Sequence, residues 1–223
     1  MEEFKRKYAN SFDRLSKDEF QNKCDEIAKD LFNNYCIKCD GKDSKKEFYF
    51  AEIEFYYWQK DKWDEKWNQV TYARDGYKAG DLFFHLSGID ICFDSTFDEK
   101  NGCKNPKFGG ILIRSIMDEC GKVVAGPWNS MMAILNACKG GSMPHLFGAT
   151  KRQHTPTVMS TYRQLGEVDM VEEEKNPLHL CFYDVAIPKD NWNFEKKSFN
   201  KTEAKEETTK TYYNKTRFKY DKN

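Results

Sequence analysis

The sequence predicts an α+β fold: a single domain with a mixed or antiparallel, curved β-sheet or partial barrel and flanking helices. Three observations predict it. Segments such as 47–58 and 109–117 are rich in aromatic and β-branched residues, which is typical of strands. Apolar residues recur at three- and four-residue spacing between 20 and 32, as in an amphipathic helix. Glycine and proline clusters separate these segments.

The 223 residues are enough for one large domain with a sizeable core. We expect residues 1–46 to hold N-terminal helices, because Ser11 and Ser16 are plausible N-caps in front of the amphipathic repeat. Residues 47–138 form the core that carries the motifs. Residues 139–223 complete the domain with helices, strands and a charged tail.

The middle region predicts two long strands with a hairpin between them. The expected strands are 47–58, 82–86, 89–93 and 109–117, with a turn at Ser87-Gly88. Polar loops are expected before and after the hairpin, at 59–81 and 98–108. A short strand should follow the Cys120-Gly121 turn, and a helix should begin at Pro127 and end at Gly140-Gly141.

The third region has weaker signals. We expect an irregular segment with helical stretches over 142–177, a strand over 178–187, an exposed connection over 193–210 and a last strand over 212–220.

The composition bounds the function. Thirty-six basic and 36 acidic side chains cancel, which argues against a protein that bulk electrostatics drives onto DNA. The sequence has no secretory signal pattern and no apolar run that approaches the ~20 residues of a membrane span. We therefore expect a cytoplasmic protein, or a nuclear one in a eukaryote, without a membrane partner.

The eight cysteines are scattered, as in a cytosolic protein with reduced thiols. Cys36 and Cys39 form a lone CxxC pair, and a zinc site would need a second pair nearby. We expect no metal and no cofactor.

Charged residues on otherwise apolar strands mark a candidate site. Glu52, Glu54 and Tyr56 alternate with Ala51, Ile53 and Phe55, so they should share one face of their strand. That face is either exposed to solvent or carries a catalytic acid with an aromatic neighbour.

The hairpin repeats this alternation, because Asp90, Cys92 and Asp94 should share one face. Arg114 follows three apolar residues on a strand that reads as buried, and a buried arginine needs a partner. Glu54 or Asp94 is the expected counter-ion. The pair is either structural or holds a carboxylate that activates water.

Five short motifs occur in one order along residues 48–138. They are Glu52-Ile53-Glu54-Phe55-Tyr56, Gly80-Asp81-Leu82-Phe83-Phe84-His85, Gly88 to Asp94, Gly110 to Arg114, and Gly126-Pro127 at the start of a helix. In order and spacing this set resembles the mammalian-type 3-methyladenine (alkyladenine) DNA glycosylases. Members of that family flip a damaged purine out of the duplex and hydrolyse its glycosidic bond.

The resemblance implies a role for each matched residue. Glu54 falls on the general base that deprotonates water, and Arg114 falls on the residue that helps hold that water and the carboxylate. The pocket positions are Tyr56 as a stacking aromatic, His85 or, with a one-residue slip, Phe84 as another, and Asp94 as the discriminating residue, with Glu52 and Asp90 beside them.

The chain also departs from the family pattern at its DNA-contacting positions. An aspartate replaces the family's asparagine at 94, residues 57–72 contain no histidine, and the intercalating hairpin position reads Ser87. Trp128 and Asn129 replace a polar residue and a lysine after Gly126-Pro127.

Two functions follow from this pattern. The first is a divergent DNA glycosylase acting on damaged duplex DNA through Glu54. The second is an inactive or repurposed pocket that binds a free nucleotide, a nucleobase or a nucleotide-derived signal, for example in a protein that sequesters such a signal against host defence. A structural protein without a ligand is the remaining interpretation.

Overall fold

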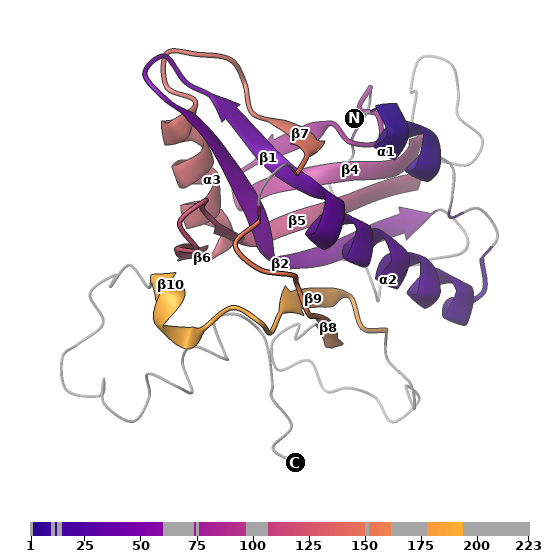
Figure 1. Ribbon diagram of the computed structural model, residues 1–223. Coiled ribbons are helices and arrows are strands. Elements are labelled where there is room, and N and C mark those ends of the chain that lie inside the picture. The colour runs from indigo at the N-terminus through magenta and orange to yellow at the C-terminus, as the bar shows by residue number, and fades with distance from the viewer. Residues whose placement is uncertain are drawn as a thin grey trace, which may run out of the picture.

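The computed structural model describes residues 2–9, 12, 15–59, 74, 76–96, 107–149, 152–161 and 178–193 (Figure 1). The helices are α1 (Glu2–Tyr8), α2 (Lys17–Asn34) and α3 (Pro127–Ala137), and a short 3-10 helix, η1, spans Lys189–Asn191. The strands are β1 (Tyr35–Asp40), β2 (Lys45–Gln59), β3 (Leu82–His85), β4 (Gly88–Thr96), β5 (Lys107–Met117), β6 (Val123–Ala125), β7 (His145–Gly148), β8 (Val158–Thr161), β9 (Cys181–Asp184) and β10 (Trp192–Asn193).

These elements form an α+β fold around a curled, mainly antiparallel sheet that makes half a barrel. One path through the sheet runs β10-β6-β5-β2-β1-β7, and the only parallel pair among the described strands is β10 with β6. The hairpin of β3 and β4 joins the first half of β5, and β9 with β8 joins the second half of β2. The long central strands β2 and β5 therefore change partners along their length.

All three helices cover one face of the sheet, where the main core lies (Figure 1). Ser16 is the N-cap of α2, and its side chain accepts a hydrogen bond from the Glu19 N–H in a capping box. Its buried side chains Phe20, Ile27 and Leu31 pack into this main core. A second, smaller cluster, the far-face cluster, is formed by Cys36, Tyr49, Ala51, Met117, Val123 and Ile187.

The middle of the chain forms the elements that its sequence predicts. β2, the β3–β4 hairpin, the fully buried β5, β6 and α3 all lie at their expected places, and Pro127 occupies the first turn of α3. None of the helices in the described part of the chain is sufficiently long and apolar to cross a bilayer.

The outer regions contain strands that were not expected. Residues 1–46 hold the expected helices, but α2 ends at Asn34 and the strand β1 follows at once, with Tyr35 in an extended conformation. Residues 142–161 contain the strands β7 and β8 instead of helical stretches. Both are short and gain their stability from pairing with β1 and β9, which local sequence does not encode. Ser11 and the segments 60–73, 97–106, 162–177 and 194–223 lie outside the described residues.

Candidate functional site

Two β-bulges face each other where β2 and β5 pair in the middle of the sheet. The register passes from Phe50–Ile116 to Glu52–Ser115 and then to Ile53–Ile113, so Ala51 on β2 and Arg114 on β5 are each an extra residue. Each strand has one extra residue at this point, so the two bulges cancel each other's shift. The pairing register before the bulges is therefore the same as the register after them.

The paired bulges decide which side chains face the main core. Before them Phe48 and Phe50 lie in the main core, and after them Ile53 and Phe55 do. Regular alternation from Phe50 would therefore point Glu52 and Glu54 into the main core. The bulge turns both carboxylates to the opposite face. It also places Ala51 in the far-face cluster, which corrects the expectation that Ala51 lies with Ile53 and Phe55.

On that face Glu52, Glu54 and Arg114 form a buried cluster, the Glu-Arg-Glu cluster. Arg114 Nε lies 2.7 Å from Glu52 Oε1, and Arg114 Nη1 lies 2.8 Å from Glu54 Oε2. The Ser115 hydroxyl donates to Glu52 Oε2 at 2.8 Å. Exposed fractions are 1% for Glu52, 0% for Glu54 and 5% for Arg114. The expected Arg114–Glu54 pair is confirmed, and the interpretation of this strand face as solvent-exposed is wrong.

Burial dominates the electrostatics of this cluster. It raises the pKa of Glu52 to about 7, against the opposing attraction and hydrogen bonds of Arg114 and Ser115, and the neighbouring charge of Glu54 adds to the rise. Burial also disfavours the charged form of Arg114, but Glu52 and Glu54 outweigh this effect and raise its pKa above the usual value. Arg114 is therefore a permanent cation, while Glu52 can change its protonation near neutral pH.

Neighbouring strands complete this face. On β9, Tyr183 lies opposite Glu52 and Cys181 lies opposite Glu54. On β5, Gly110 lies opposite Tyr56, which is half-buried. The sheet thus brings Glu52, Glu54 and Arg114 together, and Tyr56 lies further along the same strand, opposite Gly110.

A second buried cluster lies on the adjoining β3–β4 hairpin, and we call it the Arg-Asp-His cluster. Asp90 forms an ion pair with Arg74 through Oδ2, and its Oδ1 lies 3.1 Å from His85 Nε2. The backbone N–H of Ser87 donates to His85 Nδ1 at 3.2 Å. Nδ1 is therefore the acceptor, so the imidazole carries its proton on Nε2 and donates it to Asp90.

Sequence reasoning missed Arg74, although the signal for it lies in the glycines of β5. A Cβ atom on Gly110 would overlap the Arg74 guanidinium, which lies across this glycine and 5.3 Å from the Phe83 ring centroid. A glycine inside an apolar strand often marks such a close approach. The sequence shows the pair Gly109-Gly110, but it does not indicate that Arg74 packs against it.

The hairpin register settles which aromatic residue faces the site. Phe83 lies opposite Asp90, whereas Phe84 lies opposite Ile89 and packs against the main core. Phe84 therefore lies on the main-core face of the hairpin, whereas His85 lies on the same face as Phe83 and Asp90. The His85 ring stacks on Phe83 with centroids 5.9 Å apart and an interplanar angle of 26°, which adds Phe83 to the site.

Asp94 leaves the face on which it was expected. It has a positive φ of 34°, and the register of β4 with β5 shifts just after Phe93. Its Oδ2 accepts a hydrogen bond from the Tyr57 hydroxyl at 2.9 Å, and its Oδ1 lies 2.6 Å from Lys107 Nζ. Tyr57 belongs to the main core, so this irregularity directs Asp94 away from the face of Asp90 and Cys92.

The tip of the hairpin also differs from expectation. The turn is formed by Leu86 and Ser87, and Gly88 already begins β4. Leu86 is 88% exposed, whereas Ser87 uses its N–H to hold His85. Both turn residues are exposed, and Leu86 is the large apolar one of the two.

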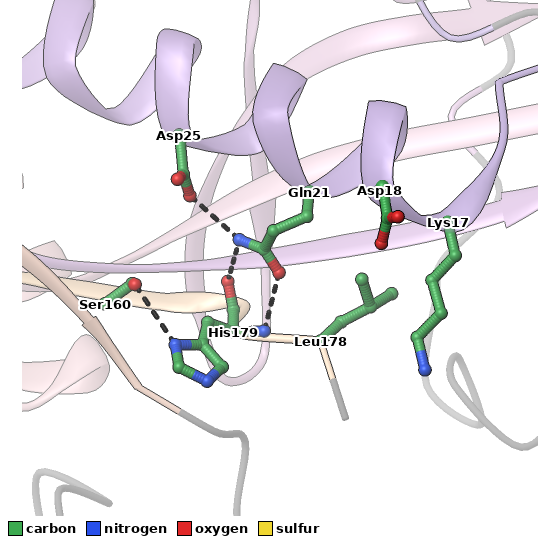
Figure 2. A pocket seen from close by; sticks show the side chains of 7 residues that line it. All are labelled: Lys17, Asp18, Gln21, Asp25, Ser160, Leu178 and His179. Atoms are coloured by element: carbon green, nitrogen blue, oxygen red, sulfur yellow. Dashed lines mark hydrogen bonds between the residues drawn. The ribbon is translucent and has the colours of Figure 1, made fainter. Parts of the chain in front are cut away.

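Figure 2 shows a separate pocket of about 230 Å³ between α2 and the chain that enters β9. Gln21 spans it: its amide bonds both the N–H and the C=O of His179, and His179 Nδ1 lies 3.3 Å from the Ser160 hydroxyl. These bonds join the helix to the sheet. The pocket contains none of the predicted site residues, and its lining is Lys17, Asp18, Gln21, Asp25, Ser160, Leu178 and His179.

The two cysteines of the CxxC pair lie in different parts of the protein. Cys36 and Cys39 lie on opposite faces of β1, the first in the far-face cluster and the second in the main core. Within the described ranges, no group of three or more His, Cys, Asp or Glu side chains is arranged to hold a metal ion.

No protein-family model matches this chain, and a comparison with curated proteins gives no match either. The geometry of the two buried clusters and the exposed hairpin tip is therefore the basis for inferring a function.

Proposed function

We propose that this chain is a divergent DNA base glycosylase that hydrolyses the N-glycosidic bond of a damaged purine flipped out of a duplex. The observation that carries the proposal is the Glu-Arg-Glu cluster, in which Arg114 holds Glu54 at 2.8 Å on a sheet face that the paired bulges create. An ion pair with a purely structural role does not require that both strands interrupt the alternation of their side-chain directions at the same point. Bulges of this kind are common next to active sites.

In the proposed reaction Glu54 is the general base. It takes a proton from water, the water oxygen forms a bond to C1′ of the deoxyribose, and the bond from C1′ to the base nitrogen breaks with its electron pair leaving on the base. Arg114 orients the Glu54 carboxylate through the Nη1 contact. Because Glu54 is fully buried, catalysis requires that binding of DNA opens a path to it.

Two further features support a flipped-base substrate. Phe83 and His85 form a stacked pair beside the site, and a flipped base is bound by stacking and a few polar edges. Leu86 is an exposed apolar residue at a hairpin tip, and leucine is among the side chains that wedge between base pairs. Trp128, also exposed, lies in the first turn of α3, whose first residue Pro127 adjoins Gly88 of the same hairpin.

The proposal is tested by single-turnover excision on duplexes that carry hypoxanthine or ethenoadenine, at low salt. We expect excision by the unaltered protein and none by Glu54→Gln. Glu47→Gln is the matched control, because Glu47 lies on the same strand but accepts a hydrogen bond from Tyr49, outside the cluster. Absence of excision by the unaltered protein would refute the proposal.

A second candidate is binding of a free nucleotide or nucleobase without excision. It is favoured by the balance of 36 basic and 36 acidic side chains, which gives no bulk attraction to a duplex, and by the engagement of Asp94 with Lys107 and Tyr57. This candidate predicts a small molecule that mass spectrometry detects after denaturation of the purified protein, together with no salt-dependent duplex binding.

A further inference from the structure

We infer that Glu52 is a positioning residue that shares Arg114 with Glu54 and so controls how firmly the Glu54 carboxylate is held. This inference rests on the proposed function and concerns the same site. It predicts that the rate of excision increases with pH as Glu52 ionises, although Glu52 does not itself contact the attacking water.

The carboxylates of Glu52 and Glu54 both pair with the guanidinium of Arg114. Arg114 uses Nε for Glu52 and Nη1 for Glu54, so both acids share a single positive charge. When Glu52 carries a proton, Arg114 pairs with Glu54 alone and holds that carboxylate firmly. When Glu52 is ionised, the same cation is shared between two anions, so Arg114 holds Glu54 less firmly and the carboxylate is available to the water.

Ser115 is oriented to favour the ionised form of Glu52. Its hydroxyl oxygen receives the N–H of Gly126 at 3.4 Å, which leaves its proton for Glu52 Oε2 at 2.8 Å. Glu52 therefore accepts from Arg114 on one oxygen and from Ser115 on the other. Burial opposes this ionisation and raises the pKa of Glu52 to about 7, so both forms are populated near neutral pH.

The other polar and charged groups near Glu52 have partners of their own and do not take the place of Arg114 as its counter-ion. From β9, Tyr183 lies opposite Glu52, and the next residue, Asp184, accepts from His154 Nε2 at 2.6 Å. Arg152 donates to the Phe50 carbonyl and lies 4.0 Å from Asp184. The charges that shift the pKa of Glu52 are those of Arg114 and Glu54.

The test is the pH dependence of single-turnover excision between pH 5.5 and 8.5. Glutamine resembles protonated Glu52, so Glu52→Gln should keep the low rate of the unaltered protein at acidic pH across the whole range. At pH 8 we expect it to be about tenfold slower than the unaltered protein. Glu52→Asp should retain a rise with pH, and the control Glu47→Gln should follow the unaltered protein.

Two results separate this inference from the proposed function. If the unaltered protein excises the base and Glu52→Gln shows the same rate and pH profile, the inference is overturned while the glycosylase proposal stands. If the unaltered protein does not excise, both are overturned.

The ¹³C shifts of the glutamate carboxyls give a second readout that does not depend on activity. One carboxyl should titrate near neutral pH in the unaltered protein and in Glu47→Gln. If no glutamate does so, the inference fails even where Glu52→Gln does not fold.

Discussion

Replacing Gly110 with alanine should break the ion pair between Arg74 and Asp90. A Cβ atom at this position would overlap the Arg74 guanidinium and lie 2.8 Å from Asp90 Oδ2. Arg74 is 1% exposed and Asp90 3%, so neither side chain can move aside into solvent. Breaking a buried ion pair costs about 3–5 kcal/mol. Alanine in place of glycine recovers only about 0.4–1 kcal/mol by restricting the unfolded chain.

The expected net change is therefore a loss of about 2–4.6 kcal/mol in the free energy of unfolding, measured by urea denaturation. Gly148→Ala is the matched control, because Gly148 also lies in a strand but a Cβ there contacts nothing within 4 Å. We expect the control to change stability by less than about 1 kcal/mol.

A double-mutant cycle isolates the contact itself. In a protein that already carries Arg74→Ala, the space above Gly110 is vacant, so adding Gly110→Ala should cost much less than it does alone. Equal costs in the two backgrounds, or a Gly110→Ala protein as stable as Gly148→Ala, would refute the position of Arg74 across β5.

Three further predictions follow from the site. Burial raises the pKa of Glu52 from 4.5 to about 7, so the folded state binds the proton more tightly. The unaltered protein should therefore lose about 3 kcal/mol of stability relative to Glu52→Gln as pH rises from about 4.5 through 7, and parallel stability curves would contradict this. Arg114→Ala leaves two buried carboxylates without their cation and should cost about 3–5 kcal/mol, whereas an unchanged melting temperature would show that this cation is dispensable. Leu86→Ala should change stability by less than about 0.5 kcal/mol but reduce excision about tenfold, and full activity would exclude a wedge role.

The sequence predicted the elements whose signals are local. Pro127 begins α3 where its fixed φ suits the first turn, and the alternation of Leu82 to Phe93 gives the hairpin. The Arg114–Glu54 pair was also predictable, because a guanidinium on an apolar strand requires an acidic partner.

What the sequence did not predict depends on pairing between distant segments. β7 and β8 are four-residue strands whose partners, β1 and β9, lie far away in the chain. The paired bulges were invisible, since a bulge changes the facing of side chains without a required residue type. Asp94 was placed on the wrong face for the same reason. Its side chain changes face because of a local irregularity of β4, which the residue type does not reveal.

The most direct test of the central claim separates binding from cleavage in Glu54→Gln. Duplex affinity and single-turnover excision are measured on the same lesion-containing DNA, with Glu47→Gln as the control. The account predicts that Glu54→Gln binds the duplex as the unaltered protein does and releases no base, while the control cleaves at the full rate. Excision by Glu54→Gln at a rate near that of the unaltered protein would contradict it.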